Sequence, residues 1–226
     1  MLKSKVEIAN IRKACVITDT IFRKVVGDFH FKTERELCRC ITGEIHRRGL
    51  PVAFRPIVAT GVGAAEPHHK AGDTMLRGFT VIDFGVRVGG YCSDMTRTVY
   101  VGVPSPRERA LYERVRAAKG CAESVVRPGV RCSDADMLAR KALGRYAKYF
   151  IHTLGHGLGK RIHEAPRIYH TRVRNYFREG MAVTIEPGIY ISGKFGIRIE
   201  DTCVVTPNGM TLLTQSPLDL FVFEAR

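Results

Sequence analysis

Apolar positions in the first fifty residues recur at helical spacing. Ser4 and Glu7 form a capping-box pattern, and an apolar side chain then returns every three or four residues. Thr33 and Glu36 repeat the box before a second periodic stretch, which ends at Gly49. The pattern therefore predicts a long amphipathic helix followed by a shorter one.

The periodicity then changes to short runs rich in β-branched residues. Segments 56–60, 79–86 and 94–101 have this composition and are bounded by residues typical of turns. Gly89 and Gly90 lie between the last two segments, where a tight turn is expected. We therefore predict three strands, the second and third of which form a hairpin.

The second half repeats this order. A helical pattern begins at Ser105 and continues to about Val126, and a further helix is expected with its cap at Ser133. Four strand-like segments follow, at 149–154, 181–191, 197–206 and 211–214. Two helices followed by strands, twice over, predict an α+β fold with halves of about 1–104 and 105–226 and no linker between them.

Composition supports an ordinary globular domain. Of all residues, 45% are hydrophobic and 26% are charged, and no apolar run approaches the roughly 20 residues that a membrane span needs. The first residues lack the apolar stretch of a signal peptide. The seven cysteines form no Cys-x-x-Cys pair, as is usual for reduced thiols. We therefore predict a cytoplasmic protein that does not contact membranes.

The charge balance is strongly basic. Lysine and arginine number 36 against 22 aspartates and glutamates, which gives a formal net charge of +14. Such a surplus is compatible with a nucleic-acid partner. The basic residues are scattered, however, and no block of like charges is present. The distribution therefore favours a solvated basic surface over nucleic-acid or ribosome binding.

Four carboxylates lie within otherwise apolar, strand-like segments. They are Asp83, Asp94, Glu186 and Glu200. A carboxylate buried in a strand is costly unless it pairs with a cation, so these four are either salt-bridged core residues or ligands of a shared metal site. His156 lies between glycines that allow close approach of the backbone and favours the metal site. An oxygen-rich site of this kind suits two divalent ions, Mn²⁺ or Co²⁺ first and Zn²⁺ or Fe²⁺ second.

These segments resemble those of the pita-bread metallopeptidases, which include methionine aminopeptidases, Xaa-Pro aminopeptidases and prolidases. The resemblance covers nearly the whole chain, and the five residues fall in the order of the family's ligands. It implies a pita-bread fold with pseudo-two-fold symmetry. It also implies that Asp83 binds one metal, that Asp94 and Glu200 bridge both, and that His156 and Glu186 complete the second site.

The residues that flank these ligands favour the proline-directed branch of the family. DFG at 83–85, SDMTRT at 93–98, EPGIY at 186–190 and RIEDT at 198–202 are similar to its motifs. The chain length points to methionine aminopeptidases, because prolidases and Xaa-Pro aminopeptidases usually carry an additional N-terminal domain that we do not expect here. We give the ligand-flanking motifs more weight, because site residues define the chemistry. The resemblance thus implies a metal-dependent exopeptidase that cleaves Xaa-Pro bonds of short peptides.

Three alternatives stay open at this point. The first is methionine aminopeptidase activity, which would use the same metals with a different pocket for the first residue. The second is a non-catalytic member that binds ribosomes, RNA or histones. The third is hydrolysis of creatine on the same fold. The complete set of five ligand types disfavours the last two, because a pure binding module has no need of buried carboxylates.

The resemblance also assigns roles around the metals. It makes Glu186 the proton shuttle between the water and the leaving amine. His163 is expected to contact the substrate carbonyl, and His68 to lie on the leaving side of the substrate. His69 is adjacent, so the assignment of His68 is ambiguous by one position.

Three further residues are expected near the metals. Arg198 and Tyr190 should lie behind them, with Arg198 paired to a ligand carboxylate or to the tyrosine. His152 precedes the glycine motif and is interpreted as structural. A homodimer is also expected, and this expectation rests only on the family resemblance.

Overall fold

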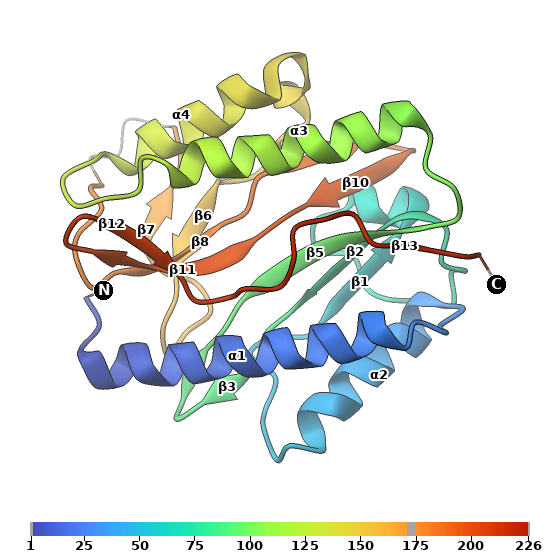
Figure 1. Ribbon diagram of the computed structural model, residues 1–226, viewed down its shortest axis with the longest axis horizontal. Helices are drawn as coiled ribbons and strands as arrows, with labels where there is room; N and C mark the ends of the chain where they lie inside the picture. Colours follow the sequence, from blue (N-terminus) through green and yellow to red (C-terminus); the bar gives the residue numbers. More distant parts are fainter. Residues whose placement is uncertain (1, 171–174, 226) are drawn as a thin grey trace.

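Two pairs of helices enclose the strands in the computed structural model, which describes residues 2–170 and 175–225 (Figure 1). One pair is α1 (Lys5–Gly27) and α2 (Glu34–His46), and the other is α3 (Pro106–Glu123) and α4 (Cys132–Leu143). The pairs lie on opposite sides of the strands in Figure 1. The order of two helices followed by strands occurs twice along the chain, as predicted.

Of the four α-helices within residues 2–170 and 175–225, three begin at the predicted caps. The hydroxyls of Ser4, Thr33 and Ser105 each accept a hydrogen bond from the backbone N–H three residues later. The residue there is a glutamate, whose carboxylate accepts from the backbone N–H of the capping residue. The expected cap at Ser133 is wrong. Helix α4 begins at Cys132, and the residue before it, Arg131, makes no capping bond with its side chain.

The first sheet comes mainly from the first half of the chain. Its order is β1-β2-β5-β13, formed by β1 (Ile57–Thr60), β2 (Gly78–Phe84), β5 (Met95–Val101) and β13 (Val222–Phe223). Strands β2 and β5 are antiparallel, which confirms the predicted hairpin, and Asp83 lies opposite Thr96. The hairpin tip carries β3 (Arg87–Val88) and β4 (Tyr91–Cys92), and both glycines of the turn have positive φ.

The second sheet has the order β12-β11-β8-β6-β7. It consists of β6 (Gly155–Gly157), β7 (Glu164–Ile168), β8 (Ala182–Ile185), β11 (Asp201–Thr206) and β12 (Gly209–Leu212). A separate two-stranded ribbon pairs β9 (Gly188–Ile191) with β10 (Phe195–Arg198). Two segments predicted as single strands are thus divided, 181–191 into β8 and β9 and 197–206 into β10 and β11. Glu186 lies at the first break and Glu200 at the second.

The predicted strand at 149–154 is wrong. The 3₁₀ helix η2 (Gly144–Tyr149) ends there, and strand β6 begins only at Gly155. The guanidinium of Arg140 donates to the carbonyls of Phe150 and His152, at 2.7 and 2.8 Å. These two carbonyls therefore bond to a side chain instead of to a neighbouring strand.

The apolar core has two main parts. One lies between helices α3 and α4 and the second sheet, with Tyr112, Phe177 and Ile185 fully or almost fully buried. The other lies between α1, α2 and the first sheet, and its members Phe22 and Phe84 are completely buried. A second 3₁₀ helix, η1 (Gly61–Ala65), follows β1. Across the described ranges, the helices are too short or too polar to span a membrane.

Candidate metal centre

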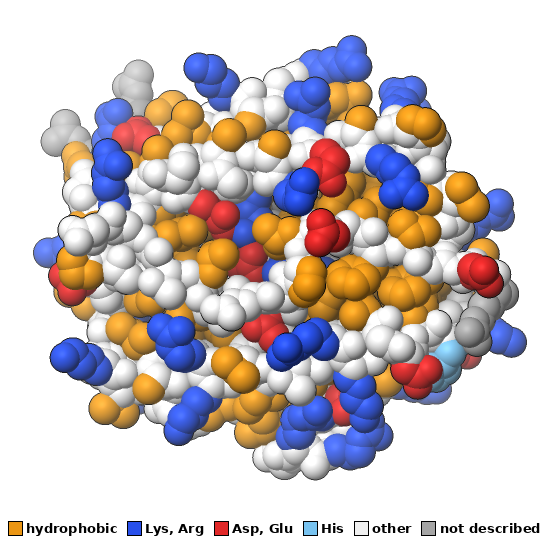
Figure 2. All heavy atoms as spheres, in the orientation of Figure 1, with side chains coloured by type: hydrophobic (Ala, Val, Ile, Leu, Met, Phe, Trp, Pro, Cys, Tyr) orange, Lys and Arg blue, Asp and Glu red, His pale blue; other side chains and the backbone are white. Residues whose placement is uncertain are grey.

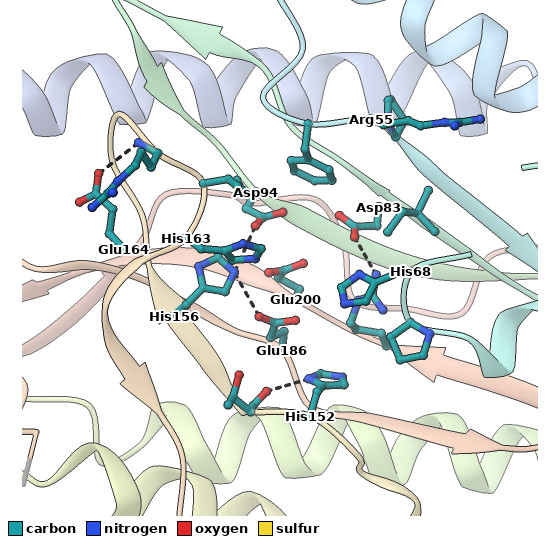
Figure 3. Close-up of a pocket in the computed structure, with 18 of the residues that line it drawn as sticks. Arg55, His68, Asp83, Asp94, His152, His156, His163, Glu164, Glu186 and Glu200 are labelled. Carbon is teal, nitrogen blue, oxygen red and sulfur yellow. Dashed lines mark hydrogen bonds and ion pairs between the residues drawn. The ribbon is translucent and has the colours of Figure 1, made fainter. Parts of the chain in front are cut away.

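The four strand carboxylates and His156 line one cavity of about 810 Å³. They come from both sheets and from the breaks between strands. Asp83 is the second-last residue of β2, Asp94 precedes β5 and His156 lies in β6, whereas the two glutamates occupy the breaks. Figure 3 shows Asp94, His156, Glu186 and Glu200 pointing into a common space. The structure therefore brings together all five predicted ligand residues.

Three of these residues form a compact donor set. Ligand atoms of Asp94, His156 and Glu200 all lie within 4.8 Å of one another. His156 Nε2 is 3.5 Å from Asp94 Oδ2 and 3.4 Å from Glu186 Oε1. Carboxylate oxygens together with one imidazole nitrogen are donors that Mn²⁺, Co²⁺, Zn²⁺ and Fe²⁺ accept.

Asp83 provides a direct test of whether a cation fits. Its Oδ2 accepts from Arg198 Nη2 at 2.7 Å, but its Oδ1 is buried and has no hydrogen-bond partner among the described residues. A buried carboxylate oxygen without a hydrogen-bond partner is costly, and a bound cation would offset that cost. The residues present therefore fit a divalent cation on this side of the cavity.

The protonation states of these carboxylates reflect their crowding. Burial, followed by the neighbouring carboxylates, raises the pKa of Asp94 and Glu200 well above their ordinary values. Burial raises the pKa of Glu186 to about 8, although Arg198 opposes the shift. Without cations the cavity floor therefore retains protons that bound metal ions would displace.

Arg198 organises the wall behind these carboxylates. Besides Asp83, it donates to Tyr190 Oη at 2.9 Å and to Thr96 Oγ1 at 2.9 Å. Thr96 Oγ1 in turn donates to Glu200 Oε2 at 2.6 Å. Arg198 thus contacts both a carboxylate of the predicted ligand set and the tyrosine.

Thr96 and Thr184 were not predicted from the sequence to belong to the site. Thr184 Oγ1 donates to Glu186 Oε1 and accepts from the His156 backbone N–H, both at 3.1 Å. Each threonine lies two residues from a predicted ligand, and residues two apart share one face of a strand. That spacing was the signal that could have identified them.

The histidines near the cavity have different surroundings. His163 packs edge-on against His156, with ring centroids 4.3 Å apart, and burial lowers its pKa. His152, interpreted above as structural, lines the cavity, and its Nε2 lies 2.8 Å from Tyr190 Oη. Burial and then Arg198 lower the pKa of His152 to about 3, so its ring is neutral near pH 7.

The structure distinguishes His68 from His69. Both line the cavity, but His69 Nε2 is bonded to the buried carboxylate of Glu34 at 2.9 Å. His68 is exposed in the cavity beside Asp83 (Figure 3). Of the two, His68 is therefore the one available to a ligand.

The mouth of the cavity is basic although its floor is acidic. Glu164 at the mouth pairs with Lys3 at 2.9 Å. We call the four exposed basic residues that line the mouth the rim cations: Arg55, Lys70, Arg161 and Arg167. On the face shown in Figure 2, lysines and arginines are spread over the surface without forming one continuous patch.

Comparison with known proteins gives a consistent result. Residues 9–207 match the profile of metallopeptidase family M24. A Xaa-Pro dipeptidase of Pyrococcus furiosus is 40% identical over 97% of this chain and 65% of the relative. An uncharacterized peptidase of Staphylococcus saprophyticus is 40% identical over 94% of this chain and 62% of the relative. The chain thus spans less than two thirds of the length of these relatives.

Solved structures agree in fold. A prolidase from Thermococcus sibiricus superposes with a TM-score of 0.93 at 38% identity, covering 98% of this chain and 62% of that one. An X-Pro aminopeptidase from Thermotoga maritima gives 0.93 at 37% identity, covering 98% and 64%. These matches confirm the predicted α+β pita-bread fold and the resemblance to the proline-directed branch. The chain belongs to metallopeptidase family M24.

Proposed function

We propose that the protein is a metal-dependent exopeptidase that hydrolyses the Xaa-Pro bond at the N-terminus of short peptides. The observation that carries this proposal is the convergence of four carboxylates and His156 in one cavity, with a buried oxygen of Asp83 unpartnered within the described structure. The names of the similar proteins, Xaa-Pro dipeptidase and X-Pro aminopeptidase, support the choice of substrate.

The cavity residues would hold two divalent ions. Asp83, Asp94, His156, Glu186 and Glu200 supply the donors, and their predominance of oxygen favours Mn²⁺ or Co²⁺ over Zn²⁺ or Fe²⁺. When bound, such ions lower the pKa of a water molecule and polarise the scissile carbonyl. Four anionic side chains against one Arg198 leave a negative charge that two divalent ions offset.

Glu186 is the proposed proton carrier. Its carboxylate faces the cluster, 3.4 Å from His156, and is oriented by Thr184 at 3.1 Å. Nearby cations stabilise a carboxylate anion, so the charged form would be available as a base. It would take the proton of the attacking water and deliver it to the leaving amine.

Two histidines are proposed to orient the peptide. Burial disfavours the protonated ring of His163, so a neutral imidazole is available to donate one hydrogen bond to the carbonyl under attack. His68 lies beside Asp83, where it would contact the leaving side of the substrate. A proline there has no amide hydrogen, so this side must be recognised through ring shape and packing.

The test is peptide hydrolysis by metal-stripped protein to which Mn²⁺, Co²⁺ or Zn²⁺ is returned. We expect cleavage of Met-Pro or Ala-Pro-Ala only with metal, and a loss of roughly 10²-fold or more in kcat for Glu186→Gln. The exposed Glu179→Gln variant is the matched control and should retain activity. Comparison of the dipeptide with the tripeptide separates prolidase from aminopeptidase activity.

Other results would contradict the proposal. Cleavage of Met-Ala-Ser alone would identify a methionine aminopeptidase. No cleavage of any peptide with any metal would favour a binding module and would call for nucleic-acid binding assays. The homodimer and the cytoplasmic location stay predictions, which light scattering and cell fractionation can check.

A further inference from the structure

A buried carboxylate outside the metal cluster holds the chain segment that carries His68. Glu34, the first residue of α2, is completely buried, although it belongs to none of the predicted ligands. We propose that Glu34 and His69 form a clamp that sets the position of His68 in the substrate cavity. This inference rests on the proposed function, and it makes Glu34 a positioning residue that contacts neither substrate nor metal.

The carboxylate of Glu34 accepts three hydrogen bonds from the segment 60–72. Its Oε1 accepts from the backbone N–H of Thr60 at 2.8 Å. Its Oε2 lies 2.9 Å from the backbone nitrogen of Gly72 and 2.9 Å from His69 Nε2. One buried side chain thus binds both ends of the segment, at Thr60 and Gly72, and also His69, the neighbour of His68.

The backbone of α2 reinforces the same attachment. The N–H groups of Glu34 and Arg35 donate to the carbonyls of Thr74 and Gly72, at 3.1 and 2.9 Å. Free N–H groups at a helix start are available for such bonds. The far end of the segment is therefore fixed to the helix by both backbone and side chain.

The ring of His69 also packs closely against Gly63. A Cβ added to Gly63 would lie 2.8 Å from the ring carbon Cε1, so a glycine there lets the ring pack against the turn. The His69 N–H donates to the Glu66 carbonyl at 3.1 Å. His69 is thus held by Glu34, by the packing against Gly63 and by its own backbone.

His68 itself has no such attachment. Its side chain makes no hydrogen bond to any residue in the described parts of the chain, and it is exposed in the cavity. The direction of its ring therefore depends on the backbone, and the nearest fixed point is the adjacent His69. A disturbed clamp would leave His68 present but wrongly placed, and small misplacements of substrate-positioning groups can lower rates strongly.

The experiment is a double-mutant cycle of Glu34→Gln and His68→Ala, with kcat and KM measured separately on Met-Pro. Glutamine keeps the size of the side chain but cannot accept all three bonds. We expect kcat/KM to fall about fivefold to tenfold in the wild-type background and less than twofold when His68 is already alanine.

A matched control lies on the same helix. Glu44 is also buried, at 2% exposure, and pairs with Lys24 and Arg48, away from the segment 60–72. Glu44→Gln should lower the melting temperature without lowering kcat/KM. If Glu34→Gln does not fold, Gly63→Ala displaces the His69 ring instead and serves in the same cycle.

A second readout does not depend on activity. In Glu34→Gln the Gly72 amide should exchange faster with solvent, and the ring Cε1–H signal of His68 should shift, whereas Glu44→Gln changes neither. Unchanged signals, or an equal loss of kcat/KM with and without His68, would overturn the clamp. If the wild-type protein cleaves no peptide, the proposed function fails, and the ring and amide signals alone decide whether the clamp exists.

Discussion

The crowded carboxylates make the metal-free fold sensitive to pH in an unusual direction. Burial raises the pKa of Glu186 from 4.5 to about 8, and Asp94 and Glu200 are shifted the same way. The folded protein therefore holds protons that the unfolded chain has already released. Stability falls with increasing pH wherever the folded state binds more protons. The contribution is complete below pH 4.5 and is lost as pH rises through about 8.

The size of the effect follows from the Glu186 shift. The difference between 4.5 and about 8 corresponds to about 5 kcal/mol, at about 1.4 kcal/mol per pH unit. This value describes Glu186 alone, and because the three carboxylates repel one another, their individual contributions cannot simply be added. For a chain of 226 residues, 5 kcal/mol corresponds to a decrease of roughly 10–20 °C in melting temperature.

The assay is thermal unfolding of chelator-treated protein between pH 5 and pH 8, followed by circular dichroism. We expect the melting temperature to fall across this range, and added Mn²⁺ to restore it more strongly at pH 8 because cations replace the missing protons. Glu186→Gln should weaken the pH dependence, whereas the exposed Glu179→Gln should not. A melting temperature that rises from pH 5 to pH 8 without metal would refute the reasoning, as would an unchanged slope in Glu186→Gln.

Three further predictions concern the cavity wall and mouth. Arg198→Met removes the cation beside Asp83 and should lower the free energy of unfolding by about 3–5 kcal/mol in denaturant titrations, whereas Arg198→Lys should lose less. Gly196→Ala would drive its Cβ into the carbonyl of Ala64 and should yield little folded protein, whereas Gly209→Ala, with open space around it, should melt within about 2 °C of the wild type. The rim cations should favour cleavage of Ala-Pro-Asp over Ala-Pro-Lys. Hydrolysis rates measured from about 0.02 to about 0.5 M salt should show this preference shrinking, because dissolved ions screen exposed charges. A preference independent of salt would contradict an electrostatic origin.

Local signals in the sequence predicted most of the helices. The boxes at Ser4, Thr33 and Ser105 are satisfied by bonds within four residues, so their outcome needs no knowledge of the rest of the fold. The strand at 149–154 failed for the opposite reason. Its apolar residues fit a strand, but the side chain of Arg140 on α4 donates hydrogen bonds to the carbonyls of Phe150 and His152. That contact depends on tertiary structure.

The site was predictable in membership but not in arrangement. Carboxylates in apolar segments are conspicuous in a sequence because burial makes them costly, and this identified Asp83, Asp94, Glu186 and Glu200. The pattern of apolar residues predicted that Glu186 and Glu200 lie inside long strands. In the structure both strands break at these glutamates, and Pro187, which has no N–H to donate, follows the first. The breaks turn the chain at the cavity, which pattern alone does not show.

The contacts around the cavity also explain why the two halves of the chain depend on each other. The Glu200 N–H donates to the Thr96 carbonyl at 3.0 Å, and Thr202 Oγ1 donates to the Asp94 carbonyl at 2.8 Å. Thr98 Oγ1 donates to the Arg198 carbonyl at 2.8 Å. These bonds join β5 of the first sheet to the β10–β11 segment where the predicted ligands lie. Neither half contains all five predicted ligands, so the same bonds that join the halves also fix the distances between the predicted metal-ligand carboxylates.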